Sequence, residues 1–485
     1  SLLEITIPDS VKKIGSSAFY GCDSLISVVI GSGVTEIEGG AFRDCSLLES
    51  LTIKNSKASI GEYAFSGCKS LNSVNLGSGI TSIGYKAFES CISLEKITIP
   101  GSVKSVGVEA FVECLSLGSV KFEDGEMTID DYAFYECDNI SSVILGNGLK
   151  SIGYDAFKGC SSLTKIAIPD SVTFIDDNAF YHTGLTDVKL GSGASNIYNA
   201  FYHTPWYISL KPDEEGFIIV DNVLIAYKVP AYSEDDVDGQ AVYKTDCIIP
   251  DRVKCIADGA FSRYEETQDH LESVVIPNGV KVIGQSVFTN CRKLRTVQLP
   301  DGLETVSDSM FWRCQGLESI LIPKNVKTIG KSAFLGCKGL KSITIPNSVK
   351  EIEEYAFSEC TGLSSIVIPN SVEKIGKFAF SECTGLKNIS LPDGVKAIDE
   401  SAFSDCTSLS SINIPKSVQT IAKNVFSNTP WLKSKQKESP VVAVNNIVVD
   451  VTACKGDVVI PEGITGFMPG VFENNTKITG ITLPG

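Results

Sequence analysis

The chain has 485 residues, of which 43% are hydrophobic and 21% are charged, and its formal net charge is −16. This composition is that of a folded protein and excludes an intrinsically disordered one. The acidic balance, without any patch rich in Lys or Arg, argues against nucleic acid and against anionic membranes as partners. No apolar run approaches the roughly 18 residues of a transmembrane helix, so we expect no membrane insertion from this sequence.

A 23-residue repeat runs along the chain. Its clearest unit extends from Leu340 to Cys360 and follows the pattern L-x-x-I-x-I-P-x-S-V-x-x-I-x-x-x-A-F-x-x-C-x-x. Repeats are decisive for the fold, because a solenoid grows by stacking coils and not by adding domains. The Phe of the pattern marks eighteen coils, at Phe19, Phe42, Phe65, Phe88, Phe111, Phe134, Phe157, Phe180, Phe201, Phe261, Phe288, Phe311, Phe334, Phe357, Phe380, Phe403, Phe426 and Phe472.

The letters of one coil predict its local structure. The segment L-x-x-I-x-I alternates apolar and polar residues, which is the period of a half-buried strand. The Pro or Gly that follows ends the strand, V-x-x-I is a second short extended segment, and A-F-x-x-C fits a tight turn. One coil cannot bury its own apolar face, so coils must stack. The sequence therefore predicts a repeat solenoid with a parallel β-sheet.

The repeat phase fails twice, each time after a Thr-Pro-Trp motif that ends at Trp206 or at Trp431. The recurrence of this Trp favours a packing role over ligand stacking. A charged stretch follows each motif, and an apolar run follows that stretch. A turn-forming pair divides each apolar run in two, at 221–222 (Asp-Asn) in the first interruption and at 445–446 (Asn-Asn) in the second. This pattern predicts a β-hairpin in each interruption.

We therefore expect five segments. They are a first leucine-rich array of nine coils (1–203), a hairpin-bearing insertion (204–248), a second array of eight coils (249–428), a second hairpin-bearing insertion (429–458) and the start of a further array (459–485). The insertions need not be separate domains and could be enlarged coils. Because the repeat pattern continues through both ends, we interpret the sequence as part of a longer protein whose signal and anchor lie outside it.

The signature I-P-x-S-V-x-x-I-G-x-x-A-F-x-x-C resembles the BspA-type leucine-rich repeats of bacterial surface and secreted proteins. The resemblance covers nearly the whole chain, and it implies a leucine-rich-repeat solenoid. Proteins of this family occur in gut and oral anaerobes and resemble adhesins, some of them linked to host matrix proteins. The resemblance implies no catalytic residues, and it fixes no binding residues by motif.

Cysteine recurs once per coil in two rows, Cys22 to Cys160 and Cys291 to Cys406, while Cys247, Cys255 and Cys454 lie outside them. Metal ligands must converge from different directions, and the sequence has no C-x-x-C pair. A stacked Cys instead acts as a small buried hydrophobe. We expect free thiols, no metal and no cofactor.

Three other patterns carry weaker chemical signals. His182 and His203 occupy matching positions of adjacent coils, but they lack neighbouring Cys or paired acids, which favours a surface role over a metal site. Ser162 and Lys165 match S-x-x-K without its companion motifs, so we expect no nucleophile there. The acidic run at 233–239 could bind calcium, but it lacks EF-hand spacing, and a solvated loop is favoured. We expect no catalytic site.

The solvent face of the long strands is the candidate binding face, because its outward positions are small, polar and almost without aromatic side chains. Repeat duplication alone could also keep small residues there. The candidate residues in the second array are Ser273, Thr296, Gln298, Ser319, Ser342, Thr344, Ser365, Asn388, Ser411 and Asn413. The scarcity of aromatic platforms argues against glycan binding at this face.

These observations predict a non-catalytic scaffold or adhesin, secreted or attached to the cell surface. We expect a monomer that binds an extracellular protein of a host or of a neighbouring cell through an extended solenoid face. Two alternatives stay open: an architectural spacer that displays another domain, and a glycan-binding accessory module.

Overall fold

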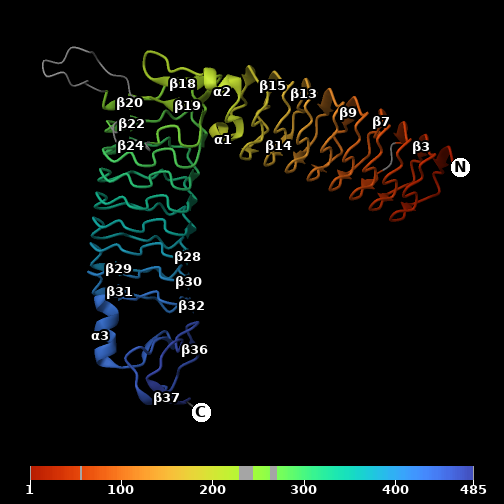
Figure 1. Cartoon of the computed structure of the whole chain (residues 1–485). Helices are drawn as coiled ribbons and strands as arrows, with labels where there is room; N and C mark the ends of the chain where they lie inside the picture. The colour runs from red at the N-terminus through yellow and green to blue at the C-terminus, as the bar shows by residue number, and fades with distance from the viewer. Residues whose placement is uncertain (1, 55–56, 229–243, 263–269, 484–485) are drawn as a thin grey trace. The chain divides into compact units, whose positions relative to one another are not determined.

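The computed structural model describes residues 2–54, 57–228, 244–262 and 270–483. Coils of about 23 residues stack into a parallel β-solenoid, as Figure 1 shows, so the predicted fold class is confirmed. The chain divides into two compact units, Ser1–Asp213 with Ile218–Ile225 and Glu214–Phe217 with Ala226–Gly485. None of the helices in the described ranges is both long enough and apolar enough to cross a membrane. The acidic run at 233–239 lies outside the described residues.

Each of the first eight coils of unit 1 supplies one long and one short strand, and the ninth supplies a long strand and the helix α1 (Ile197–Phe201). The long strands are β1 (Glu4–Ile7), β3 (Ser27–Ile30), β5 (Ser50–Ile53), β7 (Ser73–Asn75), β9 (Lys96–Ile99), β11 (Ser119–Phe122), β13 (Ser142–Ile144), β15 (Lys165–Ala167) and β17 (Asp187–Lys189). The short strands are β2 (Lys13–Ile14), β4 (Glu36–Ile37), β6 (Ser59–Ile60), β8 (Ser82–Ile83), β10 (Ser105–Val106), β12 (Met127–Ile129), β14 (Leu149–Ile152) and β16 (Phe174–Ile175). The short strands form one eight-stranded sheet in chain order.

Parallel pairing places most strand residues on their own repeat equivalents. Ser27 in β3 pairs with Ser50 in β5, and Ile30 pairs with Ile53, which is a shift of 23 residues. Val28 and Ile30 are buried, while the alternate residues of the strand are partly exposed. Because side chains in a strand alternate between its two faces, the apolar half of the repeat forms continuous buried rows.

The phase-marking phenylalanines form a stacked ladder through the core. In unit 1, from Phe19 to Phe201, neighbouring ring centroids lie 4.8–5.4 Å apart. All the marker rings are buried except those of Phe19 and Phe472, which are partly exposed.

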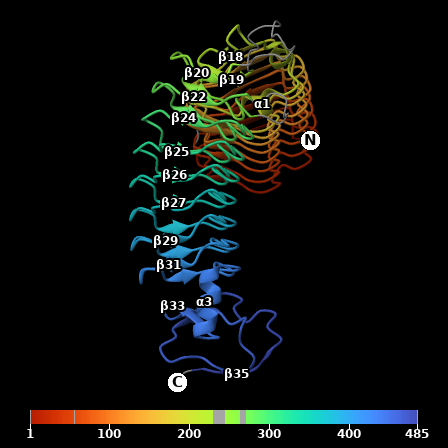
Figure 2. The same ribbon diagram turned by 90° about the vertical axis from the view of Figure 1, so that its left-hand side faces the viewer.

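Unit 2 continues the same architecture, which Figure 2 shows from the side. Its long strands are β20 (Asp246–Ile248), β22 (Ser273–Val275), β24 (Thr296–Gln298), β29 (Asn388–Ser390), β31 (Ser411–Asn413), β35 (Gly456–Val459) and β37 (Ile478–Thr482). Its short strands are β21 (Cys255–Ile256), β23 (Val282–Ile283), β25 (Thr305–Val306), β26 (Thr328–Ile329), β27 (Glu351–Ile352), β28 (Lys374–Ile375), β30 (Ala397–Ile398), β32 (Thr420–Ile421) and β36 (Gly466–Phe467). Isolated parallel bridges join Leu321, Thr344 and Val367 between β24 and β29.

Both interruptions contain the predicted hairpin. In the first, β18 (Phe217–Val220) and β19 (Val223–Tyr227) neighbour each other in one sheet across a two-residue turn. In the second, β33 (Val442–Val444) pairs antiparallel with β34 (Ile447–Asp450). Asn445 and Asn446 both have positive φ, 49° and 64°, as a tight type I′ turn requires.

A short helix precedes each hairpin, and the sequence analysis did not predict it. The helices are α2 (Pro205–Ser209) and α3 (Pro430–Glu438), and a further helix, α1 (Ile197–Phe201), lies in the last coil of the first array. Thr204 and Thr429 are the N-cap residues of α2 and α3, and each hydroxyl oxygen accepts a backbone N–H three residues later. Pro follows as the first helical residue. Thr-Pro is therefore a sequence signal for the start of each helix, and the prediction of a hairpin did not use it.

Candidate functional site

The predicted binding-face residues lie together on the outward side of the long-strand row in unit 2. Nine of the ten are exposed, and Ser273 is partly buried. The registers align Ser273 with Thr296 and Asn388 with Ser411, each pair on adjacent strands. A residue shared by equivalent positions of successive coils therefore forms a column along the face.

Local hydrogen bonds fix some polar side chains of this face. The Ser273 hydroxyl donates to Asp246 Oδ1 at 2.5 Å, and the Asn413 amide donates to Ser390 Oγ at 3.4 Å. The bond between Asn413 and Ser390 spans one coil and leaves both side chains at the surface. Such polar groups can exchange their water contacts for bonds to a partner.

A shallow hollow of about 520 Å³ lies on this face over β22 and β24. Ser273, Thr296 and Gln298 line it together with Val275 and Leu321. Three of the ten predicted residues therefore border one depression. The hollow has the size of a small ligand pocket, but it opens on a surface of parallel strands, which suits a side chain of a partner.

Sequence reasoning missed the apolar half of this face. Three aliphatic side chains occupy outward positions and are at least 70% exposed: Ile248 (70%), Leu321 (79%) and Val367 (75%). They stand in the same column as Gln298 and Thr344. Exposed aliphatic side chains next to polar ones are a feature of protein-interaction surfaces. The sequence signal is an aliphatic residue at an outward strand position, but the binding face was predicted from the polar residues at these positions alone.

The other chemical signals in the sequence do not converge. His182 and His203 lie side by side with ring centroids 5.9 Å apart, both exposed. Lys165 pairs with Asp187 at 3.8 Å on the strand face, while Ser162 lies in an exposed turn. Across the described residues, no three His, Cys, Asp or Glu side chains gather as metal ligands would.

The row cysteines are buried, except Cys22, which is partly exposed, and none of them forms a disulfide in the part of the chain that the structure describes. From Cys45 to Cys160 and from Cys291 to Cys406, the Sγ–H donates to the carbonyl oxygen of a Phe in the preceding coil, at 3.0–3.4 Å. Burial raises the pKa of the Cys45 thiol to about 11 and that of Cys137 to about 12. These thiols stay protonated near neutral pH, which gives them neither nucleophilic nor metal-binding character.

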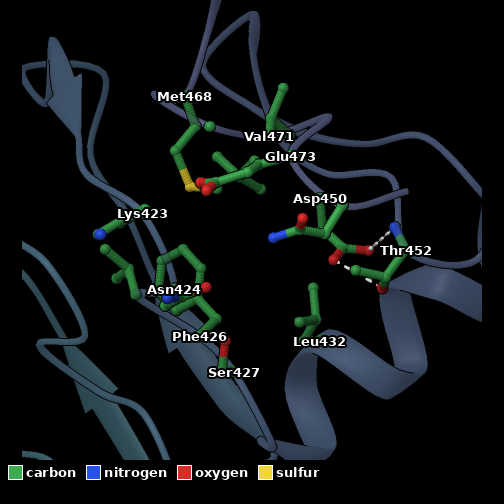
Figure 3. Close-up of a pocket in the computed structure, with 14 residues that line it drawn as sticks. Lys423, Asn424, Phe426, Ser427, Leu432, Asp450, Thr452, Met468, Val471 and Glu473 are labelled. Atoms are coloured by element: carbon green, nitrogen blue, oxygen red, sulfur yellow. Dashed lines mark hydrogen bonds between the residues drawn. The ribbon is translucent and has the colours of Figure 1, made fainter. Parts of the chain in front are cut away.

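A second hollow, of about 240 Å³, lies where the regular coils of unit 2 meet the hairpin of β33 and β34. Figure 3 shows Asp450 and Thr452 on one side of it and Lys423 and Phe426 on the other. Val449 and Phe426 both line the hollow, and the ring that packs against Phe426, at 4.6 Å, is that of Trp431 and not a further Phe of the ladder.

Three polar residues of this second hollow, Asp450, Thr452 and Lys423, have partners inside the protein. Asp450 accepts hydrogen bonds from the Thr452 hydroxyl at 2.8 Å and from Gln436 Nε2 at 2.9 Å. Lys423 forms an ion pair with Glu400 at 3.3 Å. We therefore treat this hollow as a packing defect between a regular coil and the hairpin, and not as a ligand site.

Stacked parallel coils, a phenylalanine ladder and an exposed long-strand face define the chain as a leucine-rich-repeat solenoid. The sequence model described as "BspA type Leucine rich repeat region (6 copies)" matches residues 1–117, 81–206, 242–343 and 327–450. These matches cover most of the chain, so it belongs to the BspA-type leucine-rich-repeat family of bacterial surface proteins. No curated protein matches it.

Solved structures of bacterial repeat proteins are similar to this chain. A leucine-rich cell surface protein from Faecalibacterium prausnitzii A2-165 is 30% identical, with 75% of this chain and 86% of that chain covered and a TM-score of 0.30. A leucine-rich repeat protein from Bacteroides ovatus ATCC 8483 is 23% identical, with 99% and 92% covered and a TM-score of 0.31.

Proposed function

We propose that this chain is a non-catalytic, secreted or cell-surface scaffold that binds an extracellular protein through the long-strand face of unit 2. The observation that carries the proposal is the mixed character of that face. Hydroxyl and amide side chains stand beside Leu321 and Val367, which are exposed to solvent by more than 70%. Exposed aliphatic side chains that share one column with polar ones resemble the mixture of apolar and polar contacts in a protein interface.

The membership of the chain in a family of surface proteins supports an extracellular location and an adhesin role. The absence of a converging acid, base and nucleophile among the candidate residues supports a scaffold over an enzyme. We further propose that the chain acts as a monomer, and that the hairpin-bearing segments 204–248 and 429–458 are enlarged coils of one scaffold. A spacer that only displays another domain is the rival to be tested.

Charge substitutions on the face test the proposal without disturbing the core. The double variant Leu321→Lys/Val367→Lys replaces two aliphatic side chains of this column by ammonium groups. Thr305→Lys places one ammonium group on an exposed position of the short-strand sheet as a control. Extracellular proteins of a host and of neighbouring bacteria are offered to the immobilised wild-type chain and variants, and bound proteins are quantified by mass spectrometry.

A protein partner of this face should be captured by the wild type and by Thr305→Lys but lost with the double variant. Capture that is the same for all three, or no saturable capture by any, would favour the spacer. Size-exclusion chromatography with light scattering measures the oligomeric state in the same preparations.

A further inference from the structure

The aromatic side chains that the strand face lacks gather on another row of unit 1. They flank the Ala-Phe pair in the four coils marked by Phe134, Phe157, Phe180 and Phe201. We call the two residues before and the two after each of these pairs the tyrosine face. These sixteen positions hold six tyrosines, two histidines and four carboxylates, but a single ammonium group. In the seven coils from Phe288 to Phe426 the same positions hold one tyrosine, so repeat duplication does not explain the cluster.

The tyrosine face is continuous from coil to coil. The Tyr132 and Tyr154 rings meet at a centroid distance of 5.5 Å, and the Tyr181 and Tyr202 rings stack at 6.3 Å. Backbone bonds hold these segments in a row, with Tyr132 N–H donating to the Tyr154 carbonyl at 2.8 Å. Tyr198 and Tyr202, whose centroids lie 5.3 Å apart, are 46% and 40% exposed. Ring surface on this row is therefore accessible to a partner.

Rings of this face already accept a cation from within the protein. Lys158 Nζ lies 5.5 Å from the centroid of Tyr135 and 5.6 Å from that of Tyr181. Asp155 holds the ammonium group at 2.7 Å. In an earlier coil, the Arg43 guanidinium lies 4.9 Å from the ring of Tyr63, and both residues adjoin an Ala-Phe pair. The negative face of an aromatic ring attracts a cation, and this row presents ring faces in the orientation that such contacts need.

The charge of the tyrosine face also favours a cationic partner. Its carboxylates are those of Asp131, Glu136, Asp155 and Asp177, against the one ammonium group of Lys158. Asp155 is buried, and its Oδ1 makes no hydrogen bond within the part of the chain that the structure describes. A hydrogen bond to Glu136 raises the pKa of Tyr135, as expected beside excess negative charge. A partner that brings positive charge would therefore be attracted to this surface.

We infer that the tyrosine face binds a Lys- or Arg-rich segment of a protein partner. Its cations would lie on the rings of Tyr198 and Tyr202 and near the surplus carboxylates. The inference rests on the proposed protein-binding function but uses a different row of the solenoid from the long-strand face. A neutral glycan on the same rings would gain hydrogen bonds to the carboxylates but no attraction to their net negative charge, so the charge balance favours the peptide.

The test uses the full chain and two synthetic peptides of repeated Gly-Arg, one with arginine and one with citrulline in its place. Citrulline keeps the shape of arginine without its charge. Dissociation constants are measured by isothermal titration calorimetry for the wild type, for Tyr198→Ala/Tyr202→Ala and for Tyr198→Phe/Tyr202→Phe. Tyr20→Ala is the matched control, because Tyr20 is 57% exposed at the same coil position outside the tyrosine face. None of these variants changes the net charge, so general attraction to the acidic chain is constant.

The arginine peptide should bind the wild type, and the double alanine variant should weaken that binding about tenfold. The double phenylalanine variant and Tyr20→Ala should stay within about twofold of the wild type. Equal binding of the two peptides, or equal losses for Tyr20→Ala and the double alanine variant, would overturn the inference. Retained peptide binding by the double alanine variant, with loss of binding to a neutral oligosaccharide, would assign the rings to glycan instead. Capture through the long-strand face is unaffected by these outcomes, so the two proposals can fail separately.

Discussion

The phenylalanine ladder makes a quantitative prediction for Phe357, which lies in the middle of the second array. Its side chain is fully buried, and its ring stacks on Phe334 at 5.2 Å and on Phe380 at 5.3 Å. Phe357→Ala removes the buried ring and both stacking contacts. The free energy of unfolding should therefore fall by an amount in the upper part of the roughly 3–5 kcal/mol observed for such core changes. The carbonyl that accepts the Cys383 thiol at 3.1 Å stays in place.

The loss should be local, because each coil of a solenoid contacts only its neighbours. Native-state hydrogen exchange followed by mass spectrometry resolves this directly. A destabilisation of about 4 kcal/mol corresponds to roughly a thousandfold faster exchange where opening of the affected coils limits it. We expect the effect in the coils of Phe334, Phe357 and Phe380, and unchanged protection in unit 1.

Phe378→Ala is the matched control for this experiment. Phe378 lies one coil away, is only partly buried and stacks on Tyr355 at 4.8 Å outside the core ladder. Its loss should cost about 1 kcal/mol, because it gives up one ring contact and little burial. Equal exchange rates for the two variants, or a uniform loss of protection throughout the chain, would refute a ladder that stabilises coil by coil.

Three further predictions follow from the thiols, the helix cap and the hairpin turn. Burial raises the folded-state pKa of Cys137 to about 12. The contribution of this thiol to the free energy of unfolding is complete below about pH 8.5 and falls above it by up to about 1.4 kcal/mol per pH unit. Urea titrations from about pH 8 to 10.5 should therefore show that the free energy of unfolding falls less steeply with pH for Cys137→Ala than for the wild type. Parallel curves for the two proteins would contradict this. Thr429→Ala removes the hydroxyl that caps α3 and donates to the Phe426 carbonyl at 2.7 Å, which should cost about 1–2 kcal/mol and speed exchange in α3, whereas Thr429→Ser should keep most of the protection. Asn446→Val should destabilise the β33–β34 hairpin by about 1–2 kcal/mol because φ there is 64°, and Asn446→Gly should not; thermal unfolding that ranks the two equally would rule out the assigned turn.

The repeat pattern in the sequence by itself determines the architecture. A coil of a 23-residue repeat can bury its apolar face only against neighbouring coils. The burial of marker residues such as Phe357 therefore followed from the pattern. The alternation along the long strands likewise predicted which side chains, such as Ser342 and Thr344, point outward. The turn pairs at 221–222 and 445–446 predicted both hairpins because they interrupt otherwise continuous apolar runs.

Tertiary structure alone decided which residues of different coils become neighbours. The hydrogen bonds from the row thiols after Cys22 to a Phe carbonyl span 26 residues in most coils, a separation that the 23-residue period does not reveal. The tyrosine face depends in the same way on the direction of the turn around each Ala-Phe pair, which brings Tyr132 against Tyr154 and Tyr181 against His203. Periodicity specifies that equivalent positions stack, whereas contacts between non-equivalent positions depend on the path of the backbone through each coil.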